Sequence, residues 1–349
     1  MARTKQKQIK YSKNVGIHNY ERRVWRKNLK RIPVESRGHS LQRVLNENEA
    51  RHIQHSHILP VNLSIIENPE EVITSFNEME SVISQGYPIY IDMKDVNRLS
   101  IESIMYMLSL MKNLKTRKVP FHIRGNVPAT ADNFHLLKNS GFFTFVGNNA
   151  LVLRSNGETF SIHESASVEG DTVKNICQFI MQKMNIPQKS MYALYDMIIE
   201  LMTNTVEHAY ENGMNIVSHW YIYIDYDELK KEFHFAFLDN GLGIPTTVKK
   251  TSWEKFQKWV ADKGILIYGQ VDLIEASLLG AFRTRTQEEN RGKGMPGIYE
   301  FLKKKKVNNL VIVSNNGYYS ETKKIDMNAT MRGTLYYWTM RKECFYASV

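Results

Sequence analysis

The chain has 349 residues, of which 42% are hydrophobic and 23% charged, and this composition is typical of a globular protein. No apolar run reaches the roughly 18 residues of a membrane-spanning helix, and no apolar stretch of a secretory signal follows the basic first residues. The two cysteines, Cys177 and Cys344, lie far apart without metal-ligating neighbours. We therefore expect a cytoplasmic protein without a membrane partner, a disulfide or a zinc centre.

The net charge of +10 is concentrated at the N-terminus. Residues 1–43 carry 13 basic side chains against two acidic ones, a balance of +11, whereas the other 306 residues carry a net charge of −1. We treat residues 1–58 as a basic arm, in which Tyr11, Tyr20 and Trp25 are interleaved. Such an arm can bind the phosphate backbone of a nucleic acid and stack on its bases. A solvated tail, or a strap lying on its own domain or on a partner, is the alternative.

Residues 59–150 alternate between strand and helix patterns and predict a small domain in which helices pack against a sheet. The expected strands are short β-rich apolar runs at 61–66, 87–93 and 120–125. The expected helices cover 69–84, a segment that begins after a capping Ser100, and 131–140, where Gly141 ends the helix.

Residues 160–349 predict a second α/β domain. Its expected helices cover 172–184, a long segment from 188 or 189 to 210, two amphipathic pieces at 252–262 and 271–282, and 296–305. Its expected strands lie near 216–226, 232–238, 309–315, 317–325 and 332–340. The two amphipathic pieces belong to a glycine-punctuated segment of the size of a lid.

Polar side chains form a stripe along the long helix. Glu200, Asn204 and His208 are spaced at i, i+4 and i+8, opposite an apolar face. Periodicity alone leaves two alternatives open, a solvent face and the floor of a pocket. The zinc motif HExxH is absent, whereas a carboxylate and an amide one turn apart suit Mg²⁺ and the activation of a nucleophile.

The first of two glycine motifs, FLDNGLGIP, ends an apolar strand with Asp239, which Gly241 and Gly243 follow. A carboxylate at a strand end, beside glycines that allow close approach to the backbone, can accept a hydrogen bond from the exocyclic amine of a base. A tight turn is the alternative, because D-N-G is also common in turns.

The second motif, NRGKGMPGI, runs into the helix expected at 296–305 and contains Gly292, Lys293, Gly294 and Gly297. The backbone N–H groups of such a loop, together with the dipole of the helix, can bind an anionic phosphate. The motif matches neither the Walker A pattern nor the GxGxxG dinucleotide fingerprint.

Four motifs follow one another in a fixed order, with a lid-sized segment between the second and the third. They are ELMTNTVEHAY on the long helix, DNGLGI after a strand, GKGMPG before a helix, and MRGT on the last strand. As an ordered set they resemble the GHKL superfamily of histidine-kinase-like ATPases over roughly residues 165–342. The resemblance implies a Bergerat-type α/β sandwich, whose helices and mobile lid enclose ATP and Mg²⁺ above the sheet.

The resemblance also implies roles for the residues that match the motifs. Asn204 would hold Mg²⁺, and Glu200 would be the general base or would orient the attacking water. Asp239 would accept a hydrogen bond from the adenine amine, supported by Thr334. The other matches would line the cofactor site: Gly241 and Gly243 beside the base, Gly292, Lys293, Gly294 and Gly297 around the phosphates, and His208 at a position where the family often has histidine.

The form E-L-x-x-N-x-x-x-H-A is closest to the serine kinases of the anti-sigma-factor type. Residues 60–148 are in turn similar to the STAS domain of anti-sigma-factor antagonists, in which a turn presents a phosphorylated serine. The equivalent stretch here is S-I-E-S, residues 100–103, and the acceptor position falls on Ile101 or Glu102. We therefore do not expect regulated phosphorylation there. Ser100 and Ser103 as substitutes, and Glu102 as a mimic of the phosphorylated state, stay open.

We accordingly expect an ATP-binding regulatory switch that hydrolyses ATP or phosphorylates a protein on Ser or Thr, and that signals to a protein partner through its STAS-like domain. A homodimer is an open alternative for the assembly. The second hypothesis is a non-catalytic adaptor that binds nucleic acid through residues 1–43 and uses ATP as a conformational ligand.

Overall fold

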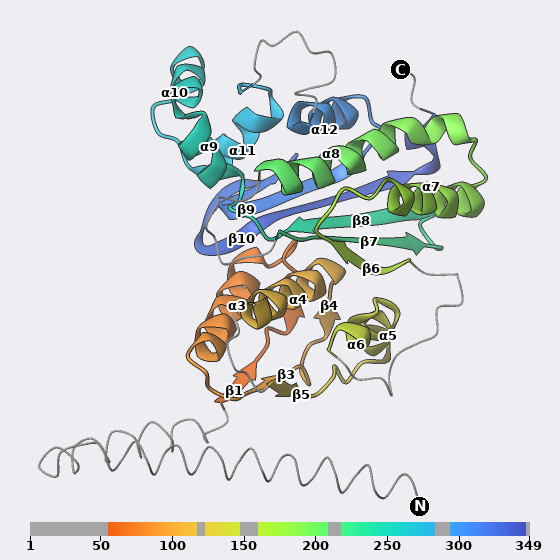
Figure 1. The fold of residues 1–349 in the computed structure, drawn as a ribbon, viewed down its shortest axis with the longest axis vertical. Coiled ribbons are helices and arrows are strands. Elements are labelled where there is room, and N and C mark those ends of the chain that lie inside the picture. The colour runs from red at the N-terminus through yellow and green to blue at the C-terminus, as the bar shows by residue number, and fades with distance from the viewer. Residues whose placement is uncertain (1–54, 117–122, 147–159, 209–217, 283–293, 347–349) are drawn as a thin grey trace, which may run out of the picture. The chain divides into compact units, whose positions relative to one another are not determined.

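A computed structural model gives the structure of the protein and describes residues 55–116, 123–146, 160–208, 218–282 and 294–346. Residues 55–349 form one compact unit. The fold is mixed α/β with parallel and antiparallel sheets, which confirms the predicted class (Figure 1). The basic arm, apart from its last four residues, lies outside the described residues, as do Gly292 and Lys293. No described helix has the length and apolar character needed to cross a membrane.

The N-terminal region, residues 55–146, contains two small parallel sheets, ordered β1–β3–β5 and β2–β4. Its elements are β1 (His55–Ile58), β2 (Asn62–Leu63), α3 (Pro69–Ser84), β3 (Ile89–Asp92), β4 (Arg98–Leu99), α4 (Ile101–Thr116), β5 (Ile123–Gly125), α5 (Ala131–Asn139) and α6 (Phe142–Phe145). The helix α3 has the bounds that the sequence predicts, because Pro69 suits a first helical turn and an apolar stripe faces the core.

The C-terminal region is built on a five-stranded antiparallel sheet in the order β6–β7–β8–β10–β9. Its strands are β6 (Phe160–Ser165), β7 (Trp220–Asp227), β8 (Glu232–Asp239), β9 (Asn308–Ser320) and β10 (Lys324–Arg341). Its helices are α7 (Gly170–Met184), η2 (Gln188–Met191), α8 (Tyr192–His208), α9 (Ile244–Thr251), α10 (Trp253–Asp262), α11 (Gln270–Leu278), α12 (Gly294–Lys303) and η3 (Lys342–Phe345).

One local prediction was wrong. The break expected between strands 309–315 and 317–325 is absent, and β9 runs through Gly317 without interruption. A side chain on Gly317 would meet Ile274 of α11, so this glycine allows close packing of a helix and makes no turn. Ser100 directly precedes α4, at the predicted cap position; its carbonyl accepts a hydrogen bond from Ile104 N at 3.3 Å, and its hydroxyl donates to Leu63 O at 3.1 Å.

The five-stranded sheet buries both of its faces. Because side chains alternate along a strand, Phe233, Phe235 and Phe237 of β8 lie in one hydrophobic cluster, whereas Ala236 and Leu238 lie in another. Every one of these five side chains is fully buried. The sheet is therefore the middle of three layers, with helices on each side of it (Figure 1).

The helices α7, α8, α11 and α12 cover the first face (Figure 1). Phe235 stacks on Trp338 of β10 with ring centroids 5.0 Å apart and an interplanar angle of 4°. Ile198 and Met202 of α8 lie in the same cluster and are fully buried. This layer fixes α8 and α12 over the strands that carry the candidate site.

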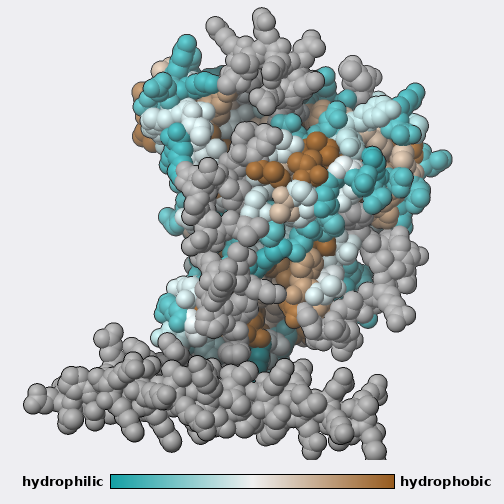
Figure 2. All heavy atoms as spheres, viewed as in Figure 1, coloured by the Kyte–Doolittle hydropathy of each residue, from teal (hydrophilic) through white to brown (hydrophobic). Residues whose placement is uncertain are grey.

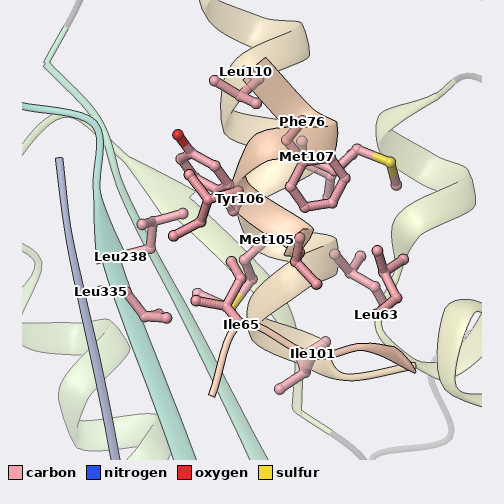
Figure 3. Packing of buried hydrophobic residues seen from close by; sticks show 14 of the residues in the cluster. Leu63, Ile65, Phe76, Ile101, Met105, Tyr106, Met107, Leu110, Leu238 and Leu335 are labelled. Atoms are coloured by element: carbon pink, nitrogen blue, oxygen red, sulfur yellow. The ribbon is translucent and has the colours of Figure 1, made fainter. Parts of the chain in front are cut away.

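The helices α3 and α4 contact the second face. Leu238 of β8 and Leu335 of β10 lie against α4, where Met105 and Tyr106 face the strands (Figure 3). The same cluster continues into the interior of the N-terminal region and includes Phe76 of α3. One continuous apolar core therefore joins residues from both predicted domains.

The two-faced core predicts a single cooperative unfolding transition for this unit. Phe235→Ala on the first face should lower the free energy of unfolding by about 3–5 kcal/mol, and Leu238→Ala on the second by about 2–5 kcal/mol. Differential scanning calorimetry of the full chain should show one main transition that both substitutions move to lower temperature. Two separate transitions, each sensitive to only one substitution, would contradict the shared core.

Candidate functional site

Asp239 and Thr334 form a buried polar pair at the end of the β8–β10 ladder. They are direct register partners, with exposed fractions of 7% and 2%. The Asp239 carboxylate accepts a hydrogen bond from the Gly241 amide at 2.8 Å and further hydrogen bonds from the backbone and hydroxyl of Thr334. The structure therefore brings three of the predicted site residues into direct contact.

Burial raises the pKa of the Asp239 carboxyl to about 6, although the hydrogen bonds from Gly241 and Thr334 act in the opposite direction. Burial also raises the pKa of the Tyr336 hydroxyl, and the charge of Asp239 adds to that effect. Carboxyl groups whose pKa is strongly shifted by burial are concentrated at binding and catalytic sites.

Two residues of β9, which the sequence did not indicate, hold the loop between Gly241 and Gly243. Asn315 donates its amide to Leu242 O at 2.9 Å and accepts a hydrogen bond from Thr246 N at 3.1 Å. Ser314 accepts a hydrogen bond from the backbone N of α9 at Ile244, at 2.8 Å. These contacts fix the loop that follows Asp239.

Gly243 and Gly333 are glycines for steric reasons. Their φ angles are +84° and +79°, in the left-handed region that side chains disfavour. A side chain on Gly243 would collide with Asn315, and one on Gly333 would collide with the backbone of Asp239. Gly333 therefore permits the close contact between the ends of β8 and β10.

The predicted pair Glu200 and Asn204 lies one turn apart on α8, and both side chains are half-buried. Tyr192, on the same helix, is 63% exposed, and Asp196, one turn before Glu200, is also exposed. The polar stripe thus passes from solvent into a partly enclosed region along the helix. His208 is the last residue of α8, and its side chain lies outside the described residues.

Burial along α8 differs from the predicted apolar face at its C-terminal end. The apolar Val206 is 39% exposed, while Leu201 and Thr205 are buried. The buried stripe is centred on Leu194, Ile198, Leu201 and Thr205, so Val206 lies at its edge. The space-filling view shows hydrophobic atoms among polar ones where α8 crosses this face (Figure 2).

The second glycine motif begins α12. Gly294 is the first residue of this helix, and Gly297 lies one turn later with open space where a side chain would stand. Met295 accepts a hydrogen bond through its sulfur from the Tyr336 hydroxyl at 3.3 Å. Since Tyr336 stands two residues after Thr334, this contact relates the start of α12 to the Asp239 pair.

The structure thus relates the predicted residues in two ways. Asp239, Gly241 and Thr334 are in direct contact, whereas Glu200, Asn204, Gly294 and Gly297 lie on helices packed over the same sheet face. No group of three or more His, Cys, Asp and Glu side chains among the described residues could hold a metal ion by itself. A cavity of about 30 Å³, room for one water, lies beneath the other half of α8, between Leu194 and Phe345.

The S-I-E-S stretch is enclosed between the two regions. Glu102 is 2% exposed and accepts a hydrogen bond from the Ser64 hydroxyl at 3.0 Å, and burial raises the pKa of its carboxyl. Ser103 is fully buried and accepts a hydrogen bond from Ile65 N at 3.0 Å. In this conformation a kinase could not reach Ser103, and Glu102 is inaccessible to a partner.

The comparisons with known proteins add no relative. The chain matches no protein-family model and none of the curated proteins. The geometry of the strand ends and of the helices above them is therefore the basis for a functional proposal.

Replacing Asp239 with asparagine should change how stability depends on pH. A carboxyl with a pKa of about 6 in the folded protein and 3.8 ordinarily favours folding below pH 4 and loses that contribution as pH rises through 6. Wild type should therefore lose about 2 kcal/mol of unfolding free energy from pH 4.5 to 7.5 that Asp239→Asn does not lose. Urea denaturation at both values measures this, with the exposed Asp196→Asn as control. An equal pH dependence in Asp239→Asn and wild type would refute the burial argument.

Proposed function

We propose that the protein binds an adenine nucleoside triphosphate with Mg²⁺, and that Asp239 accepts a hydrogen bond from the amine of adenine. The observation that carries this proposal is the buried Asp239–Thr334 pair at a strand end, beside a loop held by β9. An ionised carboxylate that has kept part of its acceptor capacity suits an exocyclic N–H donor. The left-handed glycines at 243 and 333 let Asn315 and the Asp239 backbone pack closely against the chain, which fixes the shape of the strand end where a base would bind.

The half-buried pair on α8 supports the phosphate end of the proposal. Asn204 offers an amide oxygen for Mg²⁺, and the described residues contain no acidic cluster that would hold the ion without help. Mg²⁺ commonly takes one or two protein ligands and completes its shell with phosphate oxygens and water. When bound, the ion would offset the charge of the phosphates. The start of α12, with open space at Gly297, is suited to accept phosphate oxygens.

The chemistry that fits these residues is transfer of the γ-phosphoryl group. An oxygen of water or of a Ser or Thr side chain forms a bond to the γ-phosphorus, while the bond from phosphorus to the β–γ bridging oxygen breaks. Glu200 accepts the proton of the attacking oxygen, and ADP leaves with the electron pair of the broken bond. The products are ADP and either inorganic phosphate or a phosphorylated protein.

The order of the elements supports a Bergerat-type sandwich for residues 160–349. The helix with Glu200 and Asn204, the β8 strand end, the α9–α11 segment and α12 lie on or beside one face of an antiparallel sheet, as the resemblance implies. The parallel strands and helices of residues 59–150 are compatible with a STAS-like unit. In this proposal nucleotide binding shifts the helices α9 to α12 and changes the surface that a protein partner meets.

Substitutions on α8 test binding and turnover separately. Asn204→Ala should weaken binding of ATP in the presence of Mg²⁺ at least roughly tenfold, because it removes a metal ligand. Glu200→Ala should keep the Kd near the wild-type value and lower turnover roughly 10²- to 10⁴-fold, because it removes the proton acceptor. Isothermal titration calorimetry and release of ADP measure the two effects.

Asp196→Ala is the matched control, since Asp196 continues the same stripe into solvent. It should change neither Kd nor turnover. Absence of ATP binding by the wild-type protein, or equal affinity of wild type and Asn204→Ala, would contradict the proposed site.

The charge of the basic arm favours a second candidate, a nucleic-acid-associated adaptor. Deleting residues 1–43 removes 13 basic side chains and should abolish salt-sensitive binding of DNA and RNA if the arm is the binding element. Fluorescence anisotropy across salt concentrations measures this, with ATP binding as a check of folding. An unchanged affinity and a flat dependence on salt would remove the second candidate.

A further inference from the structure

Side chains of the N-terminal region contact the ends of β8 and β10 on the second sheet face, opposite α8 and α12. Asn240, which follows Asp239, donates its side-chain amide to Asn113 Oδ1 of α4 at 2.7 Å. The oxygen of the same Asn240 side chain accepts a hydrogen bond from His219 N at 3.0 Å. Asn240 and Asn113 are 1% and 2% exposed, so water does not replace this link.

The Asn113 side chain is an unfavourable choice for packing alone. Its Nδ2 atom is buried and has no hydrogen-bond partner among the described residues. A buried unsatisfied amide destabilises a fold, and an apolar side chain of similar size would avoid that cost. The hydrogen bond that the Asn113 oxygen accepts from Asn240 therefore explains why an asparagine stands at this buried position.

A second contact from α4 reaches the other strand end. The Tyr106 hydroxyl accepts a hydrogen bond from Arg332 N at 3.0 Å, two residues before Thr334. Tyr106 is 1% exposed and lies between α4 and the strands (Figure 3). Arg332 also forms an ion pair with Glu80 of α3, with 3.1 Å between Nη1 and Oε1.

The helix α3 holds the irregular part of β10 that leads to this strand end. The register of β10 against β9 shifts between Asp326 and Thr334, which leaves backbone groups outside the ladder. The Glu70 carboxylate accepts hydrogen bonds from the N atoms of Asn328 and Ala329, both at 3.0 Å. Asn77 donates to Thr330 O at 3.0 Å, so α3 side chains replace missing strand partners.

The geometry points to α3 and α4 as a built-in support that sets nucleotide affinity, with Asn113 and Tyr106 as positioning residues for Asp239 and Thr334. This inference rests on the proposed function for its ligand. The Asp239 carboxylate and the Thr334 hydroxyl must keep their spacing to accept a base. The helix α4 contacts Asn240, next to Asp239, and Arg332, two residues before Thr334. By linkage, a partner that shifts α3 and α4 alters nucleotide binding, and the nucleotide alters the affinity for that partner to the same extent.

The experiment compares two buried asparagines of the N-terminal region. Asn113→Leu breaks the link to Asn240, whereas Asn133→Leu breaks hydrogen bonds that Asn133 makes with Leu99 N and Val96 O, within the N-terminal region. In full-length protein, calorimetry should show that Asn113→Leu raises the Kd for ATP with Mg²⁺ by about 5- to 30-fold. Asn133→Leu should lower the melting temperature yet leave the Kd within about twofold of wild type. Tyr106→Phe, which removes only the hydroxyl, should act like Asn113→Leu to a smaller extent.

Amide hydrogen exchange supplies a readout that needs no nucleotide. Asn113→Leu should speed exchange of the amides of Gly241 and Leu242, and Asn133→Leu should leave them unchanged. If wild type binds no ATP, the proposed function fails, and the exchange result alone decides the positioning role. Unchanged exchange at Gly241 and Leu242 in Asn113→Leu, or equal effects of both asparagine substitutions on Kd, would overturn the inference.

Discussion

The pairing of β8 with β10 places a carboxylate and a hydroxyl side by side at the end of a buried ladder. Gly333 is the constraint on this arrangement, because any side chain there would collide with the backbone of Asp239. With that close approach in place, Asp239 and Thr334 become register partners, and the carboxylate is enclosed while keeping hydrogen-bond partners. The raised pKa of Asp239 follows from this burial, and Tyr336, two residues after Thr334 on β10, contacts Met295 at the start of α12.

Burial of the sheet on both faces explains why so many polar contacts concentrate at its end. The middle of each central strand lies between two apolar layers, so a ligand cannot reach the side chains there. The residues of the proposed site that the structure describes accordingly lie at the strand ends and on the helices that overhang them. The same burial joins the N-terminal region to the site, because α4 packs against the strands whose ends carry Asp239 and Thr334.

The sequence allowed prediction of what depends on local periodicity. The helix α3 was predicted to the residue, and Glu200 with Asn204 was placed on one polar stripe, because an apolar stripe and a favourable first turn are visible in the chain itself. The order of the motifs along the chain indicated that Asp239 and Thr334 belong to one site. Their direct pairing became visible only in the β8–β10 register.

Contacts between distant residues were beyond prediction. Ser314 and Asn315 belong to an S-N-N-G run that is typical of a turn, yet they lie inside β9 and hold the loop after Asp239. Asn113 and Asn240 are separated by 127 residues in the chain, and no local pattern joins them. Glu102 likewise lies close to Tyr318 and Tyr337, far later in the sequence, and its charge adds to the burial that raises the pKa of both hydroxyls. Tertiary packing thus decides which polar residues support the site.

The central claim is that Asp239 recognises the base of a nucleotide whose phosphates lie between α8 and the start of α12. A crystal structure of the full chain with Mg²⁺ and a non-hydrolysable ATP analogue tests it most directly. The account predicts the adenine amine within hydrogen-bond distance of the Asp239 carboxylate, Mg²⁺ at Asn204 and phosphate oxygens at the N-terminus of α12. An analogue bound elsewhere, or a base that makes no contact with Asp239, would contradict the account.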